Sequence, residues 1–280
     1  MIENDIVPLG PRDVSNIIQR GGTMLRTARS AAFRTPEGRA QAADHLQQLG
    51  IEGVVVIGGD GSYKGAHQLM TDFPHLKLNG APGTIDNDLY GTAATIGFDT
   101  AVNTAMEAID KIRDTAAATD RLFFVEVMGR DAGFIALRTG IACGAEAVLV
   151  PETPTKLQEL IWQLRAGWER EKTSSIVVVA EGDEAGGAVD IAEQIKSELQ
   201  MDYRITVLGH IQRGGSPTAA DRLLASELGA AAVEGLLQGE TGLAYGKQAG
   251  QLSKTPLEKA VKHNAELSPG LLKLLQTLSA

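Results

Sequence analysis

Short runs of aliphatic residues alternate along the chain with longer stretches of helical periodicity. Short, mostly apolar runs predict strands at 54–57, 122–127, 147–150 and 176–179. The apolar spacing predicts helices at 40–49, 62–70, 100–113, 158–168 and 221–237, and an amphipathic helical tail from Lys254. Thr155 and Gln158 form a capping-box pattern before one of these helices. No convincing strand precedes residue 40, and 34–39 are expected to form a loop. Alternating strands and helices predict an α/β fold with mostly parallel sheets flanked by helices.

Clusters of glycine and polar residues follow the predicted strands. They lie after Ile57, around Asp86, and after Val127, Ala180 and Leu208. In parallel α/β sheets, ligands bind at the carboxyl ends of the strands. The clusters therefore predict a ligand site at those ends. No repeat or linker divides the chain, so any two lobes require the chain to cross between them.

Composition excludes several classes of protein. The chain has 280 residues, of which 43% are hydrophobic and 22% charged, as is typical of a globular protein. Its net charge of −9 argues against binding to nucleic acid or to a membrane surface. A single cysteine, Cys143, excludes an internal disulfide and agrees with a reducing cytoplasm. We find no membrane-length apolar run and no signal peptide at the start.

Two clusters combine carboxylates with glycine. In Gly58-Gly59-Asp60-Gly61-Ser62, the glycines allow backbone amides to face a polyphosphate, and Asp60 is a candidate Mg²⁺ ligand. In PGTIDND at 82–88, Asp86 and Asp88 point the same way if the segment is extended. A general base beside a metal-bound phosphate would explain two carboxylates this close. The alternatives are a plain Gly-rich turn and a solvated turn.

Two further clusters carry basic side chains. Arg130 follows a predicted strand and is placed to meet developing phosphoryl charge. His210 and Arg213 lie beside two glycines in LGHIQRGGSP at 208–217, which suggests an anion pocket that Arg204 would join. A surface arginine and a structural histidine are the alternatives. The P-loop, the dinucleotide-binding GxGxxG and zinc-ligand spacings are all missing from the sequence.

Together these clusters resemble bacterial-type ATP-dependent 6-phosphofructokinase. The resemblance runs in order through Arg20–Thr23, Arg29, GGDGS at 58–62, PGTIDND, MGR at 128–130, Pro151-Glu152, Glu181 and LGHIQRGGSP. It covers nearly the whole chain and is weakest beyond about residue 240. PGTIDND and GHIQRGGSP together are highly specific, whereas GGDG also occurs in lipid kinases and NAD kinases.

The resemblance implies a two-lobed fold and a glycolytic reaction. Residues 1–97 with 212–262 would form a larger ATP-binding lobe, and 98–211 with 263–280 a smaller sugar-phosphate lobe. A phosphoryl group would pass from ATP, with Mg²⁺, to the 1-hydroxyl of fructose 6-phosphate. The enzyme would be a cytoplasmic homotetramer whose substrate site is shared between subunits, with ADP or phosphoenolpyruvate as an effector.

The resemblance also implies roles for individual residues. Asp86 would take the hydroxyl proton, Asp60 would serve Mg²⁺ with Asp88 nearby, and Thr84 and Arg130 would stabilise the moving phosphoryl group. ATP would be bound by Arg29, Ser30, Gly59, Gly61 and Ser62. Fructose 6-phosphate would be bound by Thr84, Asp86, Met128, Gly129, Arg130, Glu181, His210 and Arg213, and across a subunit interface by Arg121 and Arg204. An effector would be bound by Arg113, Glu146, Arg170 and Lys172, for which ordinary ion pairs are the alternative.

The chain departs from the family pattern at two places, and each departure predicts a structural difference. The family opens with a strand, a Gly-rich turn and a helix upstream of Arg20, and this chain has none of them. Without this first unit, the strand that would pair with it lies at an exposed edge of the sheet, and one side of the ATP site is exposed to solvent. Asn79-Gly80-Ala81 stands before Pro82, where a continuous apolar strand is expected. A two-residue insertion here would shift the strand that delivers Asp86.

Three activities are compatible with these observations. The resemblance favours the ATP-dependent kinase, because glycines at positions 61 and 83 are typical of ATP-dependent members of the family. Pyrophosphate-dependent relatives carry Asp and Lys at these positions. The incomplete front would also suit a weak or inactive sugar-phosphate-binding paralogue or a fragment. A GGDG-type kinase acting on NAD or a lipid is the third, and GHIQRGGSP argues against it.

Overall fold

The computed structural model describes residues 1–116, 121–169, 175–199 and 202–278. Contacts divide the chain into two compact units. Unit 1 comprises Met1–Thr84, Asp88–Gly97 and Ser216–Ala265, and unit 2 comprises Ile85–Asn87, Phe98–Gly215 and Glu266–Ala280. Residues 85–87 and 212–215 thus fall in unit 2 and residues 263–265 in unit 1, whereas the resemblance implied the opposite lobe for each of these segments. Ile85 explains part of this difference, because it packs against the hydrophobic core of unit 2.

The sheet of unit 1 has the strand order β1-β2-β8-β9, and β3 also pairs with β2. Four strands are parallel to one another: β1 (Val54–Gly58), β2 (Leu78–Thr84), β3 (Ile96–Gly97) and β8 (Leu243–Gln248). β9 (Gln251–Pro256) runs antiparallel to β8. The helix predicted from Lys254 is therefore wrong at its start. Ala249 and Gly250 have φ of 49° and 78° and turn the chain into a tight hairpin.

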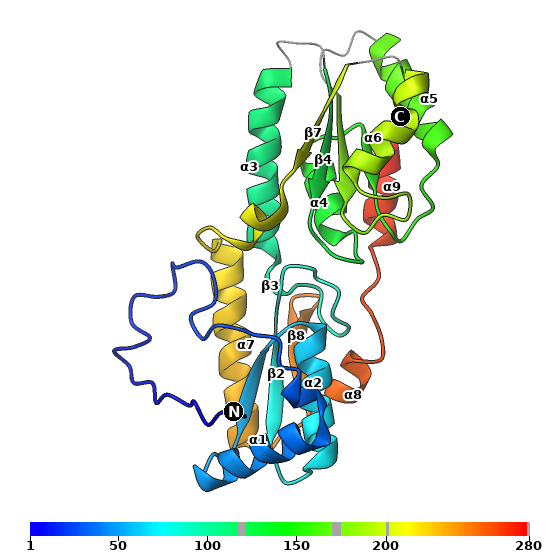
Figure 1. Cartoon of the computed structure of the whole chain (residues 1–280). Coiled ribbons are helices and arrows are strands. Elements are labelled where there is room, and N and C mark those ends of the chain that lie inside the picture. The colour runs from blue at the N-terminus through cyan, green and yellow to red at the C-terminus, as the bar shows by residue number, and fades with distance from the viewer. Residues whose placement is uncertain (117–120, 170–174, 200–201, 279–280) are drawn as a thin grey trace. The chain divides into compact units, whose positions relative to one another are not determined.

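Helices cover both faces of this sheet. α1 (Pro36–Gln48), α2 (Asp60–Asp72) and α8 (Leu257–Ala260) share a core with one face, and α7 (Ala219–Leu237) packs on the other (Figure 1). The β-strand pleat explains the division, because Val54 and Val56 join the first core and Val55 the second. Unit 1 is therefore a three-layer α/β sandwich.

The chain before α1 is irregular. Residues 1–31 contain no helix or strand, and a 3₁₀ turn (Ala32–Arg34) follows. α1 begins at Pro36, inside the segment predicted to be a loop. The Thr35 hydroxyl caps the helix by accepting a hydrogen bond from the Gly38 amide at 3.1 Å, and Pro36 occupies the first helical position. This Thr-Pro start is a sequence signal that the prediction missed.

β1 lies at the edge of its sheet, and within the described ranges it pairs with β2 alone. Its valines are only half-buried and Ile57 is 57% exposed. A continuous aliphatic run of this kind is typical of a strand that is covered on every side. Among the described residues, β1 is therefore an edge strand whose apolar side chains are partly exposed.

The polar residue within β2 does not interrupt the strand. Asn79 is fully buried; its amide group donates to the Ala232 carbonyl at 3.2 Å and its Oδ1 accepts from the Leu243 amide at 3.2 Å. These bonds satisfy a buried side-chain amide that would otherwise be costly. β2 therefore continues in register with β1, with Pro82 opposite Gly58.

The sheet of unit 2 is fully parallel, with the order β5-β6-β4-β7. Its strands are β4 (Leu122–Val127), β5 (Ala147–Leu149), β6 (Ser175–Ala180) and β7 (Tyr203–Val207). One face is covered by α3 (Phe98–Ala116), α4 (Phe134–Ala142) and α9 (Pro269–Leu278), and the other by α5 (Leu157–Glu169) and α6 (Ala188–Leu199) (Figure 1). Both units thus confirm the predicted α/β class with mostly parallel sheets.

The start of α5 differs from its prediction. The Thr155 hydroxyl donates to the buried Asp183 carboxylate at 2.8 Å, and the Gln158 side chain donates to Glu198. The predicted capping box is therefore wrong, because both side chains are used in contacts outside the helix. α5 exposes both tryptophans of the chain: Trp162 is 71% and Trp168 41% exposed. Across the described ranges, every helix is too short or too polar to cross a bilayer.

Candidate active site

The Gly-rich turn joins β1 to α2 in unit 1. Gly59 is the N-cap of α2, and Asp60 is its first residue. A Cβ atom on Gly59 would lie 3.2 Å from the Thr84 Cβ, whereas one on Gly61 would meet nothing within 4 Å. The turn therefore packs against the end of β2 and leaves open space at Gly61. The first amides of a helix and its dipole favour a bound phosphate at this place.

Asp60 is the carboxylate at this turn. It is half-buried, and its Oδ2 atom lies 2.8 Å from Lys64 Nζ, one helical turn along α2. In the described part of the chain, no three His, Cys, Asp or Glu side chains gather into a metal site. Mg²⁺ in phosphoryl-transfer enzymes is commonly held by one or two carboxylates together with substrate phosphates. Asp60 beside the open Gly61 fits that mode of binding.

Arg29 and Ser30 lie in the exposed segment before α1. The Ser30 hydroxyl accepts a hydrogen bond from the Phe33 amide at 3.2 Å. Within the described ranges, no hydrogen bond joins either residue to the Gly-rich turn. A role for these two residues in binding ATP therefore stays a prediction.

Asp86 follows β2 in a short buried segment. Asp86 is 7% exposed and Asn87 4% exposed, and Asn87 has a φ of 55°. Asparagine tolerates this left-handed conformation better than most residues. The alternative of a solvated turn is therefore wrong for these two side chains. Asp86 falls in unit 2, whereas Thr84 and Asp88 on either side fall in unit 1.

The MGR turn follows β4 in unit 2. The amides of Gly129 and Arg130 donate to Glu181 Oε1 at 3.3 and 2.7 Å. Gly129 and Arg130 both have positive φ, 146° and 55°. Glu181 follows the neighbouring strand β6, and its own amide donates to the Val127 carbonyl at 3.0 Å. Charge-assisted bonds to two amides fix the Glu181 carboxylate and the turn together.

A 3₁₀ turn (Gly209–Arg213) follows β7, the strand on the other side of β4. His210 and Arg213 are exposed, while Gln212 is 1% exposed and its Oε1 atom accepts from the Met128 amide at 2.9 Å. The structure thus brings the predicted residues at the ends of three adjacent strands together, namely Met128, Gly129, Arg130, Glu181, His210 and Arg213. Gln212 was missed, because a glutamine in a Gly-rich loop gives no sign of burial.

Arg121 and Arg204 lie at the opposite, amino end of the same strands. Arg121 precedes β4, and Arg204 on β7 is paired with Phe123. Arg204 donates to the Tyr203 carbonyl at 2.8 Å. The six residues of β4 span roughly 20 Å at about 3.3 Å each, which exceeds the reach of an arginine side chain. Within one chain, neither arginine can reach a ligand held at the MGR turn.

The predicted effector residues make structural contacts. Arg113 Nη2 donates to the carbonyls of Cys143 and Gly144, at 2.6 and 3.3 Å, and so caps the end of α4. Glu146 Oε2 accepts from the Ile176 amide at 2.5 Å. Burial, followed by the nearby Asp110 charge, raises the pKa of Cys143 to about 11. Arg170 and Lys172 lie outside the described residues.

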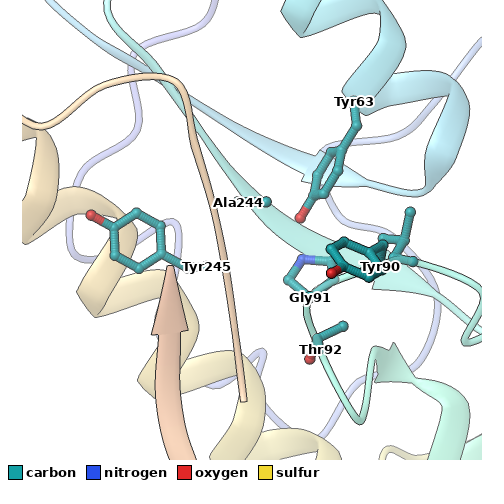
Figure 2. Close-up of a pocket in the computed structure, with 8 residues that line it drawn as sticks. Tyr63, Tyr90, Gly91, Thr92, Ala244 and Tyr245 are labelled. Carbon is teal, nitrogen blue, oxygen red and sulfur yellow. The ribbon is translucent and has the colours of Figure 1, made fainter. Parts of the chain in front are cut away.

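A separate pocket in unit 1 encloses about 170 Å³, part of it open to solvent. Figure 2 shows Tyr63, Tyr90 and Gly91 around it, while the Tyr245 hydroxyl points away. The Tyr63 hydroxyl is buried, and no partner for it is found in the described ranges. Its lining includes Pro82 of the PGTIDND segment, but none of the residues that the resemblance assigns to a ligand.

Comparison with known proteins gives a consistent result. The chain is 58% identical over 279 residues to ATP-dependent 6-phosphofructokinase 1 of Thermus thermophilus, covering all of this chain and 86% of that protein. It is 49% identical over 280 residues to ATP-dependent 6-phosphofructokinase 2 of Bacteroides thetaiotaomicron, with the same coverage. The structure is similar to phosphofructokinase from Saccharomyces cerevisiae, with a TM-score of 0.80 and 33% identity, covering 93% of this chain and 38% of that chain. The family model described as Phosphofructokinase matches residues 1–236. On this evidence the chain belongs to the phosphofructokinase family.

Proposed function

We propose that the protein is an ATP-dependent 6-phosphofructokinase that converts fructose 6-phosphate and ATP into fructose 1,6-bisphosphate and ADP. One observation carries the proposal: relatives with this name match the chain from end to end at 49–58% identity. The positions of the motif residues, at the carboxyl ends of β1, β2, β4, β6 and β7, agree with it.

The reaction requires a base and stabilisation of charge. Asp86 accepts the proton of the sugar 1-hydroxyl as that oxygen bonds to the γ-phosphorus of ATP, and the bond from the γ-phosphorus to the bridging oxygen breaks. Thr84 and Arg130 donate to the transferred group, since such transfer depends mostly on positioning and electrostatics. Mg²⁺, when bound at Asp60, would neutralise charge on the ATP phosphates.

The sugar phosphate is held by the loops of unit 2. One oxygen of Glu181 accepts from the MGR turn, and its second oxygen, which accepts no hydrogen bond in the described ranges, would bind a sugar hydroxyl. His210 and Arg213 supply exposed donors for the phosphate. Arg121 and Arg204 lie at the far end of the sheet, which supports a role in the site of a neighbouring subunit. A homotetramer with a shared site, and an ADP or phosphoenolpyruvate site that includes Arg113 and Glu146, are part of this proposal.

Asp86→Asn tests the proposal. Asparagine has the same shape and stays neutral when buried, so the fold is retained while the base is lost. We expect kcat to fall by about 10²–10⁴-fold, with the KM for fructose 6-phosphate nearly unchanged. Turnover is measured by coupling fructose 1,6-bisphosphate formation to NADH oxidation, with the exposed Asp44→Asn on α1 as a matched control.

Each outcome has a clear meaning. Retention of most of the turnover by Asp86→Asn would show that another group is the base. A wild-type protein that binds fructose 6-phosphate without turnover would indicate a binding paralogue instead. Phosphorylation of NAD or diacylglycerol in place of the sugar would indicate a different GGDG-type kinase.

A further inference from the structure

Gln212 is the buried residue of an otherwise exposed turn. Its neighbours His210, Ile211 and Arg213 are exposed, whereas Gln212 is 1% exposed. Its Oε1 atom accepts from the Met128 amide at 2.9 Å in a fully buried bond. Its Nε2 atom is also buried, and no hydrogen-bond partner for it is found in the described part of the chain.

Packing alone does not account for a glutamine at this position. A buried amide whose donor is unsatisfied destabilises the fold, and a methionine or leucine of similar size would avoid that cost. The bond from Oε1 to Met128 is thus the interaction that a glutamine provides and an aliphatic side chain does not.

The Met128 amide needs this acceptor because the backbone ladder has ended. β4 pairs with β6 as far as Val127 and with β7 as far as Glu126. Beyond Val127, three successive amides bond to side chains: Met128 to Gln212, and Gly129 and Arg130 to Glu181. The orientation of the MGR turn is therefore set by two side chains from the loops after β6 and β7.

We propose that Gln212 is a positioning residue for the sugar-phosphate site. Its Oε1 bond ties the 3₁₀ turn to the MGR turn, and so fixes the spacing between Arg130 on one side and His210 and Arg213 on the other. The inference rests on the proposed function only for the identity of the ligand. The bond itself and the order that it imposes are properties of unit 2.

Gln212→Met removes the acceptor while keeping the length of the side chain, and Gln212→Glu restores an oxygen at the same place. Exchange of the Met128 amide, followed by hydrogen–deuterium exchange with residue-resolving fragmentation, should quicken about tenfold in Gln212→Met and return toward wild type in Gln212→Glu. Ile211→Ala, which changes an exposed side chain of the same turn, should leave this exchange unchanged.

Kinetics provide the second measurement. Gln212→Met should raise the KM for fructose 6-phosphate about five- to tenfold, because the binding groups are no longer held in place. The KM for ATP and kcat should stay within about twofold of wild type. A purely structural role would lower the melting temperature without this selective rise in one KM.

The two measurements separate the possible failures. Unchanged Met128 exchange in Gln212→Met overturns the positioning role, whatever the activity, and so does an unchanged KM for fructose 6-phosphate in an active enzyme. A wild-type protein that does not phosphorylate the sugar overturns the proposed function alone, since the exchange measurement still decides the role of Gln212. If Gln212→Met does not fold, Gln212→Asn, whose oxygen is withdrawn by one carbon, takes its place with the same expectations.

Discussion

A methyl group added at Gly182 is expected to reduce turnover about a hundredfold without unfolding the protein. Gly182 follows Glu181 and lies directly against the MGR turn. A Cβ atom there would be 2.0 Å from the Arg130 carbonyl oxygen, and real Cβ atoms essentially never approach a neighbour closer than 3.0 Å. The MGR turn must therefore move away from Gly182, and with it from the adjacent Glu181, by about 1 Å or more.

That displacement falls on the bond that orients Arg130. The distance from the Arg130 amide to Glu181 Oε1, now 2.7 Å, would grow to about 3.7 Å, which is no longer a hydrogen bond. A misplacement of about 1 Å at a reacting group can lower the rate about 100-fold. Overpacking costs about 1–3 kcal/mol, less than the 5–15 kcal/mol of stability typical of a folded domain.

Steady-state kinetics and a thermal melt measure the two effects on the same Gly182→Ala sample. Gly229→Ala is the matched control, because Gly229 lies within helix α7 and a Cβ there would meet nothing within 4 Å. The control should melt slightly higher than wild type and keep its turnover. A folded Gly182→Ala variant with wild-type kcat would refute the argument that the Glu181 contact sets the position of Arg130.

Two further results are expected. Arg204→Ala should raise the KM for fructose 6-phosphate about tenfold or more with little change in kcat, because a charge-assisted bond to the phosphate is lost. Saturation kinetics measure both constants, and an unchanged KM would contradict the proposal that Arg204 belongs to a site shared between subunits. Hydrogen bonds from Arg39 and then from Gln68 lower the pKa of Asp72 below its ordinary value of 3.8. The ionised carboxylate therefore stabilises the fold above pH 3.8, and this stabilisation is lost as pH falls through the lower pKa of the folded state. Melting temperatures of wild type and Asp72→Asn should therefore converge as pH falls from about 4 toward the lower folded pKa of Asp72, and a gap of constant size over that range would contradict the assignment.

The sequence predicted the elements whose signal is local. The mostly apolar run at 122–127 is β4 residue for residue, because a strand covered on both faces needs apolar side chains on both. β9 was predicted as helix instead, since its partner β8 lies across a turn whose only mark is Ala249-Gly250. Strand pairing depends on a second segment, and no property of one segment alone reveals it.

The residues of the candidate site could be predicted from motifs, but the contacts that hold them in place could not. The motifs named His210, Arg213, Arg130 and Glu181, and the structure places all four at the ends of adjacent strands. The sequence did not reveal that Glu181 uses one oxygen to hold the MGR turn. Acceptors for backbone amides can be recognised only when the distances between loops are known.

The two exposed tryptophans on α5 limit what intrinsic fluorescence can report. Trp162 and Trp168 both belong to unit 2, so the emission carries no direct signal from the Gly-rich turn or its sheet. Because water already surrounds much of both indoles, denaturation would shift their spectrum only slightly. A blue shift on raising protein concentration would instead report that a second molecule covers this helix, which makes the native chain its own probe of assembly.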